Sequence, residues 1–101
     1  PVYRRWEKDG ERMILTFDYA EGGLCLKSAQ VTGFEIAGTD GHFVPAHAEV
    51  HSHNKKQVIV WSDEVTDPTD VRYCFRNFAV GTLYDAYGLP AAPFRTDSYP
   101  R

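Results

Sequence analysis

Four alternating residues form the most suggestive cluster of chemically active side chains in the sequence. They are His47, Glu49, His51 and His53. If one straight strand ran through all four, they would share a face, and imidazoles with a carboxylate could then ligate Zn²⁺ or Ni²⁺. Residues 52–56, Ser-His-Asn-Lys-Lys, are typical of a turn, however, and a turn would carry His53 away. We therefore predict a solvated strand face, with no metal and no cofactor.

Serine hydroxyls are the second group of side chains that could carry chemistry. Ester hydrolysis by nucleophilic catalysis needs a Ser or Cys activated by a base, together with hydrogen-bond donors for the oxyanion. The serines fall in turns or in the tail, and none lies in a Gly-x-Ser-x-Gly elbow: Ser28, Ser52, Ser62 and Ser98. Ser52 lies between two histidines, but neighbours along a strand point to opposite faces. The sequence therefore predicts no catalytic residue.

Aromatic side chains could bind sugars, because an exposed row of Trp or Tyr can stack on sugar rings. Aromatic residues make up 14% of the sequence, and the candidates for such a row are Trp6, Tyr19, Trp61 and Tyr99. Trp61 ends an apolar stretch, however, and Tyr73 alternates with other apolar residues, so both are better explained as core. A freestanding carbohydrate-binding module is therefore kept as an alternative function.

Two cysteines, Cys25 and Cys74, could form one disulfide in an exported parent protein or remain free thiols. Free thiols are the favoured alternative. An immunoglobulin-type framework would place a Trp soon after the first Cys, whereas Trp61 lies nearer to the second.

Composition and charge restrict the class of protein. The sequence has 101 residues, of which 43% are hydrophobic and 25% are charged, as in a soluble globular domain. A net charge of -3 provides no positive field for nucleic acid. The longest apolar run, residues 58–61, is far shorter than the roughly 20 residues that cross a bilayer. We therefore expect one domain over residues 1–101, with neither a nucleic-acid nor a membrane partner.

Alternation with a period of two residues predicts an all-β fold. Met13, Leu15 and Phe17 alternate with more polar neighbours after an Asp9-Gly10 turn, and a second Asp-Gly turn follows at residues 40–41. Further strands are expected at 24–26, 31–37, 43–50, 58–61 and 71–75. Short strands with turns roughly every 8–12 residues are typical of an antiparallel, immunoglobulin-like β-sandwich, and a small barrel is the alternative.

Residues 81–101 differ from the rest of the sequence in composition. Pro90, Pro93 and Pro100 oppose strand pairing, whereas the large apolar side chains of this segment require burial. We expect an irregular, proline-containing C-terminal arm that runs along the outside of the sandwich without joining a sheet and docks on another domain. The residues predicted to make this interdomain contact are Leu89, Pro90, Phe94, Arg95 and Asp97.

Short motifs follow one another in the second half of the sequence. Residues 33–38 are Gly-Phe-Glu-Ile-Ala-Gly, residues 71–73 are Val-Arg-Tyr, and residues 88–97 are Gly-Leu-Pro-Ala-Ala-Pro-Phe-Arg-Thr-Asp. In order and spacing, these motifs resemble the C-terminal end of the sialate O-acetylesterase (sialic acid-specific 9-O-acetylesterase) family. The last run is the most specific, because so many consecutive positions rarely match by chance.

The resemblance implies a non-catalytic accessory domain of a larger carbohydrate esterase. Members of the family combine an SGNH-hydrolase-like catalytic domain with β-sandwich segments and remove O-acetyl groups from sugars, above all sialic acid. Their catalytic Ser lies in a Gly-Gln-Ser-Asn motif and their catalytic His in an Asp-x-x-His motif, and neither motif occurs in this sequence. The implied partners are the catalytic domain of the parent esterase and an acetylated sugar at its rim.

The start of the sequence fits a fragment of a multidomain esterase. The sequence begins at Pro1, and its only methionine, Met13, lies inside an apolar alternation. The resemblance suggests a periplasmic, secreted or lysosomal parent protein. Besides a freestanding carbohydrate-binding module, a more remote alternative is an adhesion-type sandwich that binds protein.

Overall fold

The computed structural model describes residues 1–20, 22–26, 33–73, 83–89, 91 and 94–96. All regular elements within these residues are strands. They are β1 (Val2–Asp9), β2 (Arg12–Asp18), β3 (Leu24–Leu26), β4 (Phe34–Ala37), β5 (Val44–Pro45), β6 (His47–Val50), β7 (Gln57–Trp61), β8 (Asp70–Tyr73), β9 (Leu83–Asp85) and β10 (Phe94–Arg95). No helix in this described part of the chain has the length and apolarity to cross a membrane.

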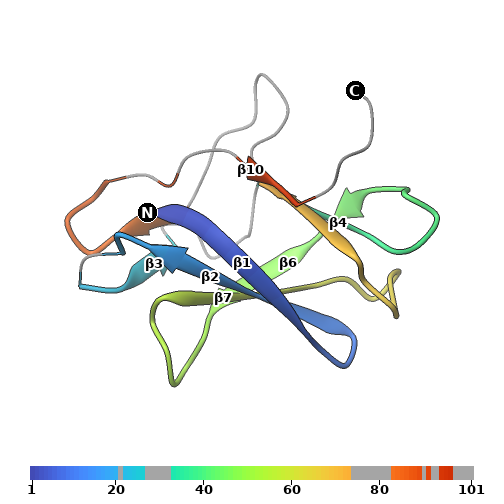
Figure 1. The fold of residues 1–101 in the computed structure, drawn as a ribbon, viewed down its shortest axis with the longest axis horizontal. Helices are drawn as coiled ribbons and strands as arrows, with labels where there is room; N and C mark the ends of the chain where they lie inside the picture. The colour runs from blue at the N-terminus through green and yellow to red at the C-terminus, as the bar shows by residue number, and fades with distance from the viewer. Residues whose placement is uncertain (21, 27–32, 74–82, 90, 92–93, 97–101) are drawn as a thin grey trace.

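The strands form two four-stranded sheets and one smaller sheet, and every pairing is antiparallel (Figure 1). The first sheet has the order β1-β2-β7-β6, and the second has the order β10-β8-β4-β5. Strands β3 and β9 form the two-stranded sheet. The predicted all-β antiparallel sandwich is therefore confirmed.

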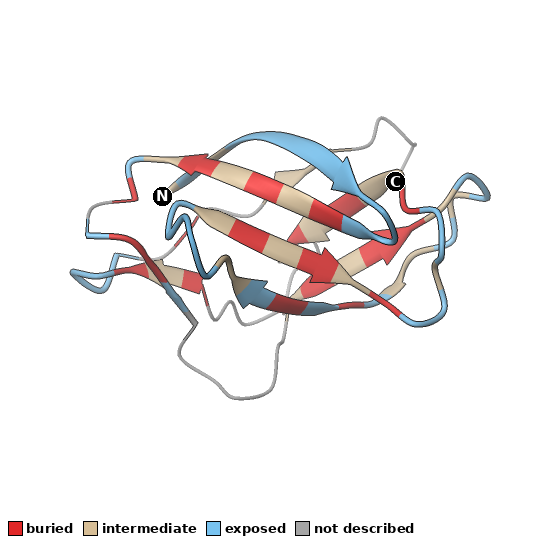
Figure 2. Ribbon diagram, turned by 90° about the horizontal axis from the view of Figure 1, so that it is seen from below, coloured by how far each residue is buried: buried red, intermediate tan, exposed pale blue. Residues whose placement is uncertain are grey.

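The core lies between the two larger sheets and follows the alternation in the sequence. Met13, Leu15 and Phe17 of β2 are buried, as are Val58 and Val60 of β7 beside it. Figure 2 shows this alternation as buried and half-buried bands along the strands. Since strand residues alternate between faces, one face of the first sheet supplies the core and the other remains accessible.

The predicted Asp9-Gly10 turn joins β1 to β2. Gly10 has φ of 62°, a left-handed conformation that glycine adopts without a Cβ clash. Strand β1 itself was not among the predicted strands, because most of its residues are exposed and its sequence has no clear alternation.

The predicted strand over residues 43–50 is wrong in one respect, because it is divided between two sheets. Val44 and Pro45 pair with β4 at the edge of the second sheet, and residues His47–Val50 pair with β7 in the first. At the change of sheet, Ala46 N donates a hydrogen bond to Phe34 O (3.0 Å). Pro45 has no N–H to donate and is tolerated because β5 is an edge strand.

The expectation that the C-terminal arm stays out of the sheets is also wrong. Residues Leu83–Asp85 pair with β3, and residues Phe94–Arg95 pair with β8 at the edge of the second sheet. These two paired stretches contain no proline, so each of their residues has an N–H that can take part in a ladder.

Candidate docking surface and polar pocket

Three of the five residues predicted to contact another domain are described, and they occupy different environments. Leu89 is 61% exposed, whereas Phe94 and Arg95 are half-buried in the edge strand β10. Pro90 and Asp97 lie outside the described residues. The structure therefore separates Leu89, which faces solvent, from Phe94, which packs within the sandwich.

Phe94 belongs to an aromatic cluster between the two large sheets. Its ring stacks on that of Tyr3 in β1, with centroids 4.5 Å apart and an interplanar angle of 5°. It also lies 5.7 Å from the ring of Phe17 in β2 and 5.7 Å from that of Tyr73 in β8. Because Tyr3 and Phe17 belong to the first sheet and Tyr73 to the second, Phe94 connects the sheets by ring contacts.

Hydrogen bonds fix the chain just after Phe94. Thr96 N donates to Val71 O (2.9 Å), and Val71 N donates to Thr96 Oγ1 (3.0 Å). Thr96 Oγ1 in turn donates to Asp70 Oδ1 (3.0 Å). This end of the arm is therefore an integral part of the sandwich.

Burial, followed by the negative charge of Asp70, raises the pKa of Tyr3 above its ordinary value of 10.0.

Asp85 organises the turn that follows β9. Its Oδ1 accepts hydrogen bonds from the N–H groups of Tyr87 (2.9 Å) and Leu89 (3.0 Å). Its backbone O accepts one from Gly88 N (3.1 Å), and its own N donates to Leu89 O (3.0 Å). The other carboxylate oxygen, Oδ2, is buried and has no hydrogen-bond partner among the described residues. This network leaves Tyr87 and Leu89 facing solvent, 78% and 61% exposed.

The turn that follows β2 lies against the Asp85 turn. It is closed by a hydrogen bond from Gly23 N to Ala20 O (2.9 Å). A Cβ at Gly22 would lie 2.6 Å from the Cβ of Ala86, so the two turns are in direct contact. Tyr19, at the start of this turn, has φ of 56° and is 75% exposed. Bulky residues rarely adopt a positive φ, so the fold holds Tyr19 in an unfavourable backbone conformation.

We name Tyr19, Tyr87 and Leu89 together the turn surface. In Figure 1, the segment around β9, in orange, extends from one end of the molecule beside β3. Among the described residues, the other exposed large hydrophobic side chains are Val2 and Trp6, both on β1. Three of these five exposed side chains therefore lie on the two contacting turns. The sequence pointed to Leu89 and noted Tyr19, but it did not place them at the same end.

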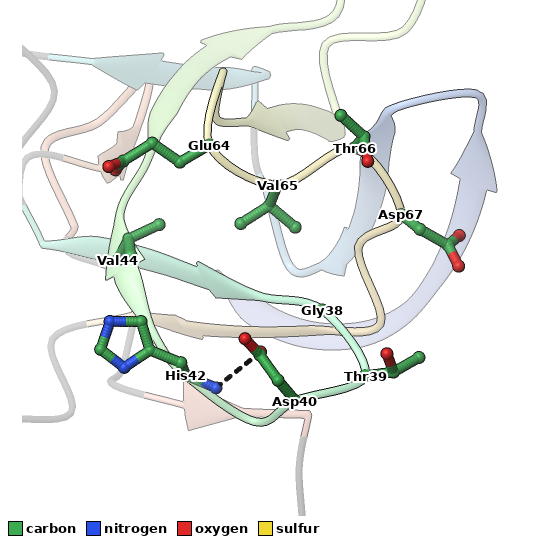
Figure 3. A pocket seen from close by; sticks show the side chains of 9 residues that line it. All are labelled: Gly38, Thr39, Asp40, His42, Val44, Glu64, Val65, Thr66 and Asp67. Carbon is green, nitrogen blue, oxygen red and sulfur yellow. Dashed lines mark hydrogen bonds between the residues drawn. The ribbon is translucent and has the colours of Figure 1, made fainter.

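A second candidate site is a pocket of about 410 Å³ between the β4–β5 turn and the segment after β7 (Figure 3). It is lined by Gly38, Thr39, Asp40, His42, Val44, Glu64, Val65, Thr66 and Asp67. Val65 points between the two segments in Figure 3, and both Val65 and Val44 pack against the core. Asp40 Oδ1 accepts a hydrogen bond from His42 N (3.0 Å), which orders the turn. The pocket thus has an apolar floor and a polar rim.

The rim of this pocket carries more negative than positive charge. Asp40, Glu64 and Asp67 contribute carboxylates, and Asp67 forms an ion pair with Lys8 from β1. Carboxylate and threonine oxygens can accept hydrogen bonds from the hydroxyl groups of a neutral sugar. They would repel an anionic ligand, because like charges disfavour each other. The pocket therefore disfavours an anionic ligand and can accommodate an uncharged polar one.

The predicted turn after His51 is present and ends the alternation of the histidine cluster. Strand β6 ends at Val50, and His53 N donates to His51 Nδ1 (3.0 Å). His47 instead lies beside Trp61, with ring centroids 5.5 Å apart, and Trp61 is half-buried rather than a full core residue as predicted. Across the described residues, no three His, Cys, Asp or Glu side chains are grouped so that they could hold a metal ion.

Two of the four candidate serines, Ser52 and Ser62, lie within the described residues. Ser62 is buried, and its Oγ accepts a hydrogen bond from Glu64 N (3.2 Å). Ser52 is exposed in the turn after β6. Ser28 and Ser98 lie outside the described residues. Cys25 in β3 is exposed, and the other cysteine, Cys74, lies outside the described residues, so the favoured alternative of free thiols stays a prediction.

A solved structure matches almost the whole chain. The carbohydrate acetylesterase XAC1771 from Xanthomonas citri is similar over 98% of the chain, with 39% sequence identity and a TM-score of 0.88. The chain is related to a carbohydrate esterase. No family model matches the chain, and no curated protein matches it.

The match covers only part of the enzyme. The chain spans 23% of the XAC1771 chain, as expected of a small accessory domain. The predicted relation to a carbohydrate esterase is confirmed at this level. Specificity for sialate stays a prediction.

Proposed function

We propose that the chain is a non-catalytic, C-terminal accessory domain of a carbohydrate O-acetylesterase of the sialate O-acetylesterase type. The observation that supports this best is the match with XAC1771, which covers 98% of the chain but 23% of the esterase. In this proposal, the ester chemistry belongs to the rest of the parent protein. The sandwich packs on an SGNH-hydrolase-like catalytic domain and supports it.

The side chains around the pocket support a non-catalytic role. Hydrolysis of an acetyl ester needs a nucleophile in contact with a base and donors for the oxyanion. The pocket is lined by threonines, carboxylates and His42, without Ser or Cys. The nearby hydroxyl of Ser62 already accepts a backbone hydrogen bond from Glu64. In this proposal, the catalytic Ser-His pair belongs to another part of the parent esterase.

Three proteins test the proposal: the parent esterase, the parent with this domain deleted, and the domain alone. Release of acetate from acetylated sialic acid and from an acetylated neutral oligosaccharide is measured for each. We expect hydrolysis by the parent, none by the domain alone, and a lower melting temperature for the deleted form. Turnover by the domain alone that is lost in Ser52→Ala, or a parent that hydrolyses no acetyl ester, would contradict the proposal.

The pocket favours a second candidate function, direct binding of a neutral sugar. Its apolar floor can contact the C–H face of a sugar ring, while the rim residues Thr39, Asp40 and Glu64 reach its hydroxyl groups. The test is a titration of the isotope-labelled domain with neutral and with sialylated oligosaccharides, followed by NMR. Shifts at residues 38–44 and 64–67, weakened in Glu64→Gln but not in the exposed control Glu7→Gln, support sugar binding. Unchanged spectra would refute it.

A further inference from the structure

The turn surface combines exposure with a constrained backbone. Tyr19, Tyr87 and Leu89 are 75%, 78% and 61% exposed, so none of them contributes its full apolar surface to the sandwich. Tyr19 is also held at φ of 56°. Residues kept in sparsely populated conformations tend to occur at sites of function, because the surrounding fold must maintain them. Tyrosines are, in addition, among the residues that dominate protein interfaces.

Asp85 is an independent observation at the same end of the molecule. Its side chain is buried, with the residue only 2% exposed, yet Oδ2 has no hydrogen-bond partner in the described part of the chain. Buried polar atoms are normally satisfied, and an exception calls for an explanation. The other oxygen, Oδ1, holds the N–H groups of Tyr87 and Leu89. The buried carboxylate of Asp85 thus has one unsatisfied oxygen, while its other oxygen fixes the backbone from which Tyr87 and Leu89 face outwards.

We propose that the turn surface docks on the catalytic part of the parent esterase. This inference rests on the proposed function, which supplies the partner. The chain corresponds to 23% of the XAC1771 chain, so in a protein of that organisation most of the polypeptide is covalently attached to the module. The partner's contact is an apolar concavity that receives the two tyrosine rings and the leucine.

The size of the surface favours an attached partner over a second copy of the chain. Separate proteins that associate stably bury roughly 800 Å² on each side, which is more than three side chains provide. Attachment raises the effective concentration to the millimolar range for a short flexible linker, so a smaller contact is sufficient. A sugar is a poorer occupant, because the N–H groups of Tyr87 and Leu89 already bond to Asp85.

Hydroxyl-radical footprinting with peptide mass spectrometry tests the assignment on the isolated chain and on the full parent esterase. In the isolated chain, Tyr19, Tyr87 and Leu89 should all be modified readily. In the parent, their modification should be lost. Trp6, which is 38% exposed on β1, is the matched control and should react equally in both proteins.

Acetate release is measured on the same parent sample, which separates the two proposals. If the parent is an active esterase but the three residues react as in the isolated chain, the surface assignment is wrong and the accessory function stands. If Trp6 is protected instead, docking occurs on β1 and the assignment is also wrong. If the parent has no esterase activity, the proposed function itself fails. Protection in the isolated chain, whether by dimerisation or by an added neutral oligosaccharide, would overturn the choice of partner.

A double variant provides the second readout. Tyr87→Ser with Leu89→Ser should leave the melting of the isolated domain unchanged, because both side chains are exposed. In the parent, the same change should restore radical modification of Tyr19, since truncating interface anchors weakens docking about tenfold or more. Trp6→Ser is the control, because Trp6 is also an exposed apolar residue of β1 but pairs with Leu15, away from Tyr19; this change should leave Tyr19 protected. Continued protection of Tyr19 in the double variant would overturn the proposal.

Discussion

Phe94→Ala should destabilise the isolated domain, because the Phe94 ring connects the two sheets. Removing a fully buried phenylalanine costs about 3–5 kcal/mol, and the half-buried position of this residue reduces the expected loss to about 2 kcal/mol. That loss includes the contacts with the rings of Tyr3, Phe17 and Tyr73. For a domain of this length, it corresponds to a decrease in melting temperature of about 10 °C.

The measurement is urea unfolding of the isolated domain, with Leu89→Ala as the control from the same arm. Leu89 is 61% exposed, so its truncation should change the free energy of unfolding by less than about 0.5 kcal/mol. The two variants therefore separate an internal contact from a solvent-exposed one. If Phe94→Ala is as stable as Leu89→Ala, the arm does not connect the sheets in solution and the reasoning fails.

Three further changes test other parts of the structure. Gly22→Ala should destabilise the domain by more than about 1 kcal/mol in urea unfolding, since the new Cβ would lie 2.6 Å from the facing turn. The control is Gly10→Ala, because Gly10 also has a positive φ, +62°, but has open space around it. Equal losses of stability in the two variants would exclude the clash. The raised pKa of Tyr3 means that its stabilising contribution is complete below pH 10.0 and is lost as the pH rises through the higher folded-state value. Wild type should therefore lose more stability above that pH than Tyr3→Phe, and parallel pH profiles would contradict the shift. Thr96→Val should cost about 1–3 kcal/mol by thermal unfolding, because it removes the hydroxyl that accepts from Val71 N and donates to Asp70 Oδ1. An unchanged melting temperature would show that these two bonds are dispensable.

The sandwich could be predicted from the sequence wherever one face of a strand is buried. Met13, Leu15 and Phe17 are spaced by two residues, and all three lie in the core. Their pattern is local, so it is visible without knowledge of the fold. The Asp-Gly turn before them was predictable for the same reason, because glycine tolerates the backbone conformation that the turn requires.

Features that depend on distant partners could not be predicted in this way. The alternation over residues 43–50 continues through Ala46 even though the chain changes sheets there. Leu89 and Phe94 are both large and apolar in the same short arm, yet one faces solvent and the other contacts three rings. Burial of a side chain in an irregular segment depends on which strands lie beside it, and the local pattern does not contain that information.

Leu89 and Phe94 lie in two parts of the arm that differ in their contribution to the stability of the domain. Phe94 and Thr96 attach one end of the arm to β8 and β1, so this end contributes to the folding of the domain. The Asp85 turn at the other end is fixed by its own hydrogen bonds and leaves Tyr87 and Leu89 exposed. Variants at the first end should therefore weaken the domain whether or not a partner is present. Variants at the second end should leave the domain's stability unchanged and affect only the docking proposed above, because effects at sites that share no contact are independent.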